Sequence, residues 1–200
     1  MIRVLIAEDQ KLVLAALSSL LSMEDDILVV ANASDGQMAV ELALQHRPDV
    51  ALIDIEMPKQ SGLDVVKQLT NQLPTCRCLI VTTFARAGYL QRAVRSGAYG
   101  YILKDADVSE IAAAIKTIYH GGKVMDPQLM IEAMASPSPL LQRESELLTL
   151  ESQGLSTKEM ASTLHLSEGT VRNYLSEIMS KLGVASRQAA IDYARQSGWI

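Results

Sequence analysis

The chain has 200 residues, of which 48% are hydrophobic and 20% charged, and its formal net charge at pH 7 is −5. This composition is typical of a folded globular protein, and it excludes a disordered, collagen-like or strongly basic nucleic-acid-binding chain. No apolar stretch approaches the ~18 residues that a membrane helix requires, and Glu8 and Asp9 stand where a secretory signal would continue. We therefore expect a cytoplasmic protein without a membrane partner, built as one large domain or two small ones.

Five short apolar runs alternate with amphipathic segments over residues 1–120. Helical spacing marks the amphipathic segments, as in residues 12–21, where leucines stand at positions 14, 17, 20 and 21. Strands buried on both faces of a sheet are expected at Ile2–Ala7, Ile27–Ala31, Val50–Ile53, Cys78–Thr82 and Tyr99–Leu103. Because each strand is followed by a helix, the sequence predicts a five-stranded, doubly wound parallel α/β sheet.

The only two cysteines, Cys76 and Cys78, stand two residues apart at the fourth predicted strand. Neighbours on one face of a strand are held too rigidly for a relaxed disulfide. A zinc site would need a second group of Cys or His residues, and the three histidines are scattered along the chain. Packing in the core is the better explanation for the pair.

Acidic, hydroxyl and basic residues follow the predicted strands, at the sheet edge where open α/β proteins bind ligands. Glu8 and Asp9 follow the first strand, Asp54 the third, Thr82 ends the fourth and Lys104 follows the fifth. Converging carboxylates repel unless a cation lies among them, and hard oxygen ligands suit Mg²⁺. Asp54 could then attack phosphorus as a nucleophile, with Thr82 and Lys104 binding the phosphoryl oxygens. A strand-end aspartate that merely caps the next helix is the simpler alternative.

The spacing of these residues resembles the receiver domain of two-component response regulators over residues 1–121. The motifs that carry the resemblance are Ile6–Gln10, Asp54–Pro58, Ser61–Leu63, Val81–Phe84 and Gly100–Asp105. Two positions depart from the common pattern: Glu8 replaces an aspartate, and Asp105 stands where many relatives have proline. The longer arm of Glu8 favours metal contact through water, and the Lys104 peptide conformation becomes less certain.

The resemblance implies a role for each residue. Asp54 would be the phosphorylated residue, and Glu8, Asp9, Asp54 and the Glu56 carbonyl would hold Mg²⁺. The remaining roles concern the response to phosphorylation, with Thr82 as the switch hydroxyl, Tyr101 as the switch aromatic and Lys104 as the phosphate contact. On phosphorylation Thr82 would move inward and Tyr101 would rotate into the space that it leaves.

Residues 122–138 are interpreted as a linker, because Gly121 and Gly122 end the fifth helix and Ser-Pro-Ser-Pro breaks a short Met-rich helical stretch at residues 136–139. Residues 139–200 show helical periodicity alone and are expected to form a second, all-α domain. Ser156 with Glu159 forms a capping box, and Ser167 caps a further helix that begins too soon after the previous one for anything but a helix-turn-helix.

The second helix of that motif has a polar outer face suited to the DNA major groove. Arginine pairs with guanine and asparagine with adenine, and hydroxyls at a helix N-terminus can bind phosphate. Lys181, at the far end of the helix, is expected to meet backbone phosphate only. The candidate DNA-binding residues are Ser167, Thr170, Arg172, Asn173, Ser176, Lys181 and Arg187.

Residues 143–187 resemble the LuxR-type DNA-binding domain, which implies four helices in residues 139–200. The whole chain therefore resembles the NarL/FixJ family of response regulators, and its motifs are most similar to the DesR type. Leu141 replaces a threonine helix cap, which leaves the first helix of this domain with a frayed or water-satisfied turn at a cost of ~1 kcal/mol. In this family the last helix joins two DNA-binding domains, so Ala189 and Ala190 are candidate positions of close packing.

The resemblance implies a transcription factor, not an enzyme, that a sensor histidine kinase phosphorylates at Asp54. Phosphorylation would promote a homodimer that binds double-stranded promoter DNA, with RNA polymerase as a further candidate partner. One alternative is a constitutive DNA-binding protein whose receiver serves only for dimerisation. A phosphatase is the other, although it lacks a second aspartate two residues after Asp54, where Glu56 stands.

Overall fold

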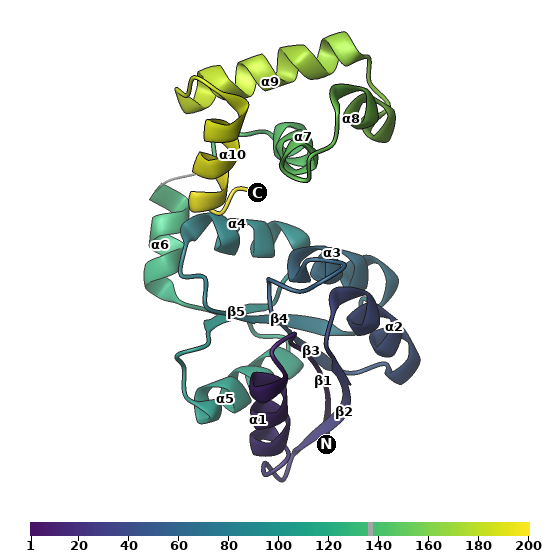
Figure 1. The fold of residues 1–200 in the computed structure, drawn as a ribbon. Helices are drawn as coiled ribbons and strands as arrows, with labels where there is room; N and C mark the ends of the chain where they lie inside the picture. Colours follow the sequence, from purple (N-terminus) through teal and green to yellow (C-terminus); the bar gives the residue numbers. More distant parts are fainter. Residues whose placement is uncertain (136–137) are drawn as a thin grey trace. The chain divides into compact units, whose positions relative to one another are not determined.

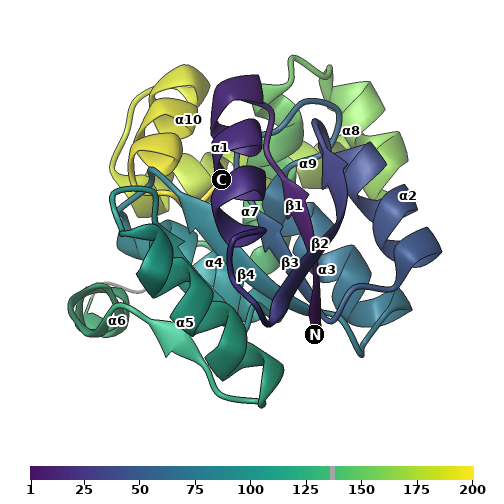
Figure 2. The same ribbon diagram turned by 90° about the horizontal axis from the view of Figure 1, so that it is seen from below.

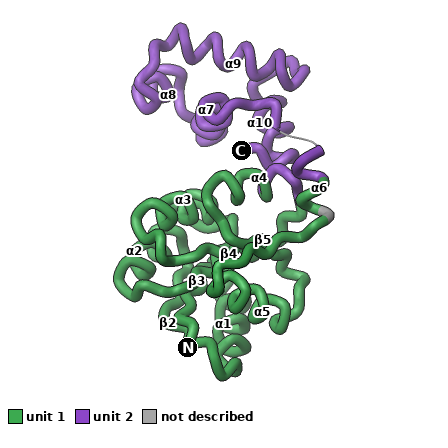
Figure 3. The backbone as a smooth tube through the Cα atoms, turned by 180° about the vertical axis from the view of Figure 1, so that it is seen from behind, with its two compact units in different colours: residues 1–85, 90–131 green, residues 86–89, 132–200 purple. Residues whose placement is uncertain are grey.

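The computed structural model describes residues 1–135 and 138–200. These residues divide into two compact units, which Figure 3 distinguishes by colour. One unit contains residues 1–85 and 90–131, and the other contains residues 86–89 and 132–200. No helix within the described ranges is long and apolar enough to cross a membrane.

A parallel β-sheet forms the centre of the first unit and confirms the predicted fold class (Figure 1). Among the described residues it has six strands, in the order β2-β1-β3-β4-β5-β6. Their bounds are β1 (Ile2–Ala7), β2 (Ile27–Ala33), β3 (Val50–Ile53), β4 (Arg77–Thr82), β5 (Gly100–Leu103) and β6 (Val124–Met125). The last residues of β1 and β3, Ala7 and Ile53, lie opposite each other in the ladder. The residues that follow these two strands are therefore neighbours in space.

Five helices cover the two faces of the sheet. Helices α1 (Lys11–Leu21) and α5 (Val108–Tyr119) lie on one face, as the view from below shows (Figure 2). The opposite face is covered by α2 (Gly36–His46), α3 (Gly62–Gln72) and α4 (Ala87–Ser96). Alternate side chains of the strands fill both interfaces, as predicted from their continuous hydrophobicity, and strand residues such as Leu52 and Leu79 are almost fully buried.

The start of α3 packs unusually closely against the end of β3. Ser61 caps the helix, because its hydroxyl accepts a hydrogen bond from the Asp64 N–H. At Gly62 a Cβ atom would lie 1.8 Å from the Asp54 carbonyl oxygen, so no residue with a side chain fits without a backbone shift. Glycine at this position thus allows the β3–α3 loop to fold back over the residue that ends the strand.

The segment interpreted as a linker contains two ordered elements. Strand β6 pairs with β5, placing Val124 opposite Gly100 and Met125 opposite Tyr101, and α6 (Pro127–Ala135) follows as the expected short helix. A two-residue strand has no periodicity that a sequence pattern could show, which is why β6 was not predicted. Residues 136 and 137 of the expected linker lie outside the described residues, and the proposed boundaries at 121 and 139 stay predictions.

Four helices build the larger part of the second unit, as the sequence predicted. They are α7 (Gln142–Ser152), α8 (Thr157–Leu164), α9 (Glu168–Leu182) and α10 (Arg187–Gln196). Ser156 and Ser167 cap α8 and α9 as expected, by accepting hydrogen bonds from Glu159 N–H and Thr170 N–H. The core contains Leu147, Val171 and Ile178, together with Ala190 of α10. Because Ala190 is fully buried within its own domain, it cannot be a packing position between two subunits, whereas Ala189 is partly exposed.

The Ser167 cap provides a test of this local structure. We expect Ser167→Ala to lower the free energy of unfolding of the helical domain by about 1 kcal/mol, because the Thr170 N–H, now 3.1 Å from the Ser167 hydroxyl, loses its acceptor. Trp199 is the chain's only tryptophan and packs against this domain's core, so urea unfolding followed by its fluorescence measures the change. Ser162→Ala, at an exposed position within α8, is the matched control and should not destabilise the domain.

Both cysteines lie in the core of the sheet unit, in agreement with the sequence interpretation. Cys78 belongs to β4, Cys76 directly precedes that strand, and both are free thiols. A hydrogen bond with Cys76, together with burial, raises the pKa of the Cys78 thiol well above its usual value.

Candidate functional site

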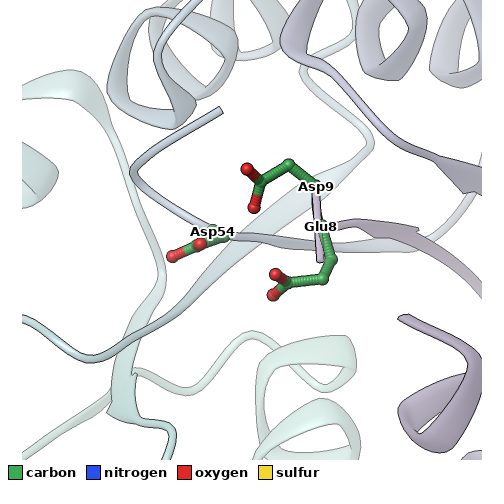
Figure 4. A group of neighbouring side chains, drawn as sticks. All are labelled: Glu8, Asp9 and Asp54. Atoms are coloured by element: carbon green, nitrogen blue, oxygen red, sulfur yellow. The ribbon is translucent and has the colours of Figure 1, made fainter. Parts of the chain in front are cut away.

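Three carboxylates meet at the carboxyl ends of β1 and β3 (Figure 4). Glu8 and Asp9 directly follow β1, and the Asp54 N–H donates to the carbonyl of Ala7, the last residue of β1, at 3.0 Å. One ligand atom from each of the three carboxylates lies within 4.8 Å of the others. Glu8 and Asp54 are buried, whereas Asp9 is exposed. The strand register thus brings together the acidic residues that the sequence predicted to converge.

Lys104 is the cation of this group. Its Nζ atom lies 2.6 Å from Glu8 Oε2 and 2.9 Å from Asp54 Oδ2, and its backbone N–H donates to the Thr82 carbonyl. Burial alone would lower the pKa of Lys104, but the hydrogen bonds with Glu8 and Asp54 outweigh it and raise that pKa above its usual value. Lys104 therefore carries a full positive charge at neutral pH between two carboxylates.

Glu8 is more deeply buried than Asp9, and only 1% of its surface is exposed. Burial raises the pKa of Glu8 above its usual value, despite opposing hydrogen bonds from Lys104 and from the Gln10 N–H. The glutamate at position 8 pairs directly with Lys104, a contact that the sequence did not indicate. Metal contact through water, favoured by its longer arm, stays a prediction.

Each carboxylate oxygen of Asp54 has a hydrogen-bond partner that orients the side chain. Oδ1 accepts a hydrogen bond from the Ile55 N–H at 2.7 Å, and Oδ2 pairs with Lys104. A carboxylate held in this way beside an ammonium group is suited to nucleophilic attack on a phosphoryl group, since the ammonium would also bind the transferred oxygens.

Thr82 and Tyr101 both bind Phe84, in the loop that follows β4. The Thr82 hydroxyl accepts a hydrogen bond from the Phe84 N–H at 3.4 Å, and the Tyr101 hydroxyl donates to the Phe84 carbonyl at 2.6 Å. Both side chains are buried. The two predicted switch residues therefore share one backbone partner, Phe84, a role that no sequence pattern indicated.

The loop after Asp54 is attached to α2 by a pair that the sequence did not indicate. Lys59 adopts a left-handed backbone conformation with φ of 67°, and its Nζ lies 2.7 Å from Asp35 Oδ2. Asp35 also caps α2 by accepting a hydrogen bond from the Met38 N–H. The hydrogen bonds from Lys59 and from the Met38 N–H lower the pKa of Asp35. The exposed side chain of Glu56 lies outside the carboxylate group, and its proposed role concerns the carbonyl alone.

An apolar cavity of about 330 Å³ adjoins Lys104 on the side of α1 and α5. Its lining includes Leu12, Leu17 and Ile111. Leu12 is 83% exposed, which is unusual for a leucine on a helix that packs against a sheet. This surface provides apolar contact area next to the acidic site.

In the helical unit, the predicted groove-facing residues lie on the outer face of α9. Arg172, Asn173 and Ser176 are exposed, whereas Val171 and Leu175 face the core. Ser167 and Thr170 lie at the N-terminus of the helix with their hydroxyl oxygens 2.8 Å apart. Arg172 has one acidic neighbour, Glu168 at 3.8 Å, and such an exposed ion pair contributes little and leaves the arginine available.

Two other predicted DNA-binding residues have ion-pair partners on α7. Lys181 Nζ lies 2.5 Å from Glu144 Oε1, and Arg187 lies 3.2 Å from Glu151. Glu144 also accepts a hydrogen bond from the Leu141 N–H at 2.8 Å. This bond satisfies the N–H of Leu141 itself, whereas no side chain caps the first-turn N–H groups that a threonine at position 141 would bind. The missing side-chain cap agrees with the expectation for Leu141.

Comparison with known proteins agrees with the geometry of both units. Residues 4–116 match the family described as "Response regulator receiver domain", and residues 138–194 match "Bacterial regulatory proteins, luxR family". The fold and the two matches define a receiver domain joined to a LuxR-type helix-turn-helix domain.

Similar proteins share this organisation over their full lengths. The transcriptional regulatory proteins YvfU and DesR of Bacillus subtilis (strain 168) are 45% and 44% identical to the chain over 200 residues, which is 100% of each sequence. The solved structure of the response regulator ChrA, from a heme-sensing two-component system, is 38% identical with a TM-score of 0.58, covering 100% of this chain and 98% of that one. The chain therefore belongs to the NarL/FixJ family of two-component response regulators, and its resemblance to the DesR type is confirmed.

Proposed function

We propose that this response regulator is activated by phosphorylation of Asp54 and then binds promoter DNA as a dimer. The observation that carries the proposal is the position of Asp54, buried beside Glu8 and Asp9 and paired with Lys104 at 2.9 Å. A sensor histidine kinase would donate the phosphoryl group. As the Asp54 oxygen forms its bond to phosphorus, the bond from phosphorus to the kinase histidine breaks.

The carboxylates of Glu8, Asp9 and Asp54, with the Glu56 carbonyl, would hold Mg²⁺. Three carboxylates within 4.8 Å of one another need only small movements to share one ion, and they are the hard oxygen ligands that Mg²⁺ prefers. When bound, the ion would supply positive charge to the phosphoryl oxygens. Lys104 would leave its carboxylate partners and bind one of these oxygens.

The switch would follow from the new dianion at Asp54. A phosphoryl oxygen attracts the Thr82 hydroxyl, which then gives up its long 3.4 Å contact with the Phe84 N–H. Because Tyr101 binds the carbonyl of the same residue, movement of Phe84 and rearrangement of Tyr101 would be coupled. Local charge would thus change the surface of the receiver domain.

We expect Thr82→Ala to accept phosphate but to lose most of the gain in DNA affinity that phosphorylation produces. The variant keeps Asp54 and Lys104 and lacks only the hydroxyl that would respond to the new charge. Parallel measurements of phosphoryl incorporation and DNA affinity separate the two effects. Thr82→Ser keeps the hydroxyl and is the matched control; an equal loss of response in both variants would contradict the role of the hydroxyl.

For DNA, we propose that α9 enters the major groove. The exposed residues Arg172, Asn173 and Ser176 would contact base edges, and Ser167 and Thr170 would bind phosphate at the N-terminus of the helix. A single helix reads few base pairs, so a dimer would bind two half-sites about one helical turn, ~10 base pairs, apart.

The kinase and the second subunit are the proposed protein partners, with RNA polymerase as a candidate at the promoter. The apolar cavity beside Lys104 and the exposed Leu12 support a protein contact next to Asp54. We propose no enzymatic turnover of an external substrate.

The test compares the protein before and after incubation with labelled acetyl phosphate, with Mg²⁺ or with a chelator. We expect label to be incorporated only with Mg²⁺, together with dimerisation in light scattering and tighter binding to a duplex selected from random sequences. If the protein incorporated no label and bound the duplex equally well under all conditions, the result would favour the alternative, a constitutive DNA-binding protein.

A further inference from the structure

Glu144 is a fully buried carboxylate in the helical domain. It stands in the first turn of α7, and none of its surface is exposed. Glutamate is almost never fully buried without a partner, and here each oxygen has one. Oε2 accepts from the Leu141 N–H at 2.8 Å, and Oε1 lies 2.5 Å from Lys181 Nζ.

Lys181 belongs to the last turn of α9, the helix proposed to enter the groove, which ends at Leu182 with Gly183 as its left-handed cap. The neighbouring Arg143 donates a hydrogen bond to the carbonyl of Leu164, the last residue of α8. Two adjacent residues at the start of α7 therefore hold the C-terminal ends of both helices of the helix-turn-helix.

We infer that Glu144 and Lys181 are positioning residues, which fix the orientation of α9, and that Lys181 does not bind DNA phosphate. The inference rests on the proposed DNA-binding function. A buried carboxylate that loses its cation keeps its desolvation cost, so transfer of Lys181 from Glu144 to a phosphate is unfavourable. The inference replaces the expectation that Lys181 is a backbone phosphate contact.

The two roles differ in their effect on the salt dependence of binding. Each phosphate neutralised on duplex DNA contributes ~0.9 to the slope of log affinity against log salt concentration. If Lys181 is held by Glu144, Lys181→Met should leave the slope for a random-sequence duplex unchanged. Glu144→Gln removes the charge that holds the lysine, so Lys181 becomes available to phosphate and the slope should steepen by ~0.9.

The experiment measures this slope in four forms of the full-length protein: wild type, Lys181→Met, Glu144→Gln and the double variant. Expected slopes are equal for wild type, Lys181→Met and the double variant, and steeper for Glu144→Gln alone. The double variant removes both charges and keeps an acceptor for the Leu141 N–H, so it remains a folded test if Lys181→Met alone unfolds.

Urea unfolding, followed by Trp199 fluorescence, provides a readout independent of DNA. Lys181→Met should lower the unfolding midpoint, and adding Glu144→Gln should restore part of the loss, because no buried charge is then unpaired. Lys158→Met, which removes an exposed lysine from α8, is the matched control and should leave the midpoint unchanged.

A slope that is shallower than that of the wild type by ~0.9 in both Lys181→Met and the double variant would overturn the inference and assign Lys181 to phosphate. The inference would also fail if Glu144→Gln alone left the slope unchanged. Wild-type protein that binds no DNA would contradict the proposed function instead. In that case the unfolding data decide the positioning role, and equal midpoints for Lys181→Met and Lys158→Met would refute it.

Discussion

Asp54→Asn protein should take up no phosphoryl group from acetyl phosphate under conditions in which the wild type is labelled. The amide has no negative charge and is a poor nucleophile toward phosphorus, although its shape would preserve the hydrogen bond with the Ile55 N–H. We therefore expect complete loss of Mg²⁺-dependent labelling, and with it loss of the phosphorylation-dependent gain in DNA affinity.

The matched control is Asp25→Asn, an exposed aspartate in the loop before β2, which should be labelled like the wild type. Mass spectrometry of the intact protein, before and after phosphorylation, measures the modified fraction without a radioactive label. Incorporation into Asp54→Asn at the wild-type rate would show that the phosphorylated residue lies elsewhere, and the roles proposed for Glu8, Asp9 and Lys104 would fail with it.

Arg172→Ala and Asn173→Ala should each weaken binding to the selected operator by ~1–3 kcal/mol, roughly fivefold to 150-fold. Both residues are exposed in the N-terminal half of α9, the part of a recognition helix that contacts base edges. Each variant should also lose its preference at a base pair, guanine for the arginine and adenine for the asparagine. Affinity for a random-sequence duplex should fall much less.

Binding of each variant to the operator, to operators changed at single base pairs and to random duplex measures this specificity. Ser180→Ala changes an exposed residue near the other end of the same helix and should leave the ratio of specific to non-specific affinity unchanged. If Arg172→Ala also preserved that ratio, the outer face of α9 would not read bases, and the proposed docking would be incorrect.

The central strands of the sheet were predictable because they are buried on both faces. The expected bounds of the strands at Ile2–Ala7 and Val50–Ile53 are those observed. In both strands the apolar run in the sequence coincides with the buried segment of the chain. Strand β6 was not predicted, because its two residues are ordered by pairing with β5 and not by any pattern of their own. A strand that forms only by pairing with a neighbour is visible in the tertiary structure and not in the local sequence pattern.

The neighbourhood of the candidate site was also predictable, whereas its individual contacts were not. Parallel strands that end at one edge bring Glu8, Asp54 and Lys104 together whatever their exact conformations. That Lys104 pairs with both carboxylates depends on side-chain reach. In the helical domain, Lys181 and its partner Glu144 are 37 residues apart, and helix periodicity says only that the lysine faces outward. A residue interpreted as a DNA contact can therefore also have a protein partner that the sequence does not indicate.

The burial of Cys76 and Cys78 has a consequence for chemical work on this protein. Burial keeps reagents from both side chains, and the raised pKa of Cys78 further disfavours its thiolate, the form that reacts readily with alkylating reagents and oxidants. A cysteine introduced on the surface of either domain would then be the one reactive thiol of the folded chain. Fluorophores or spin labels could be attached there without removing either native cysteine, and the native packing of the sheet would be preserved.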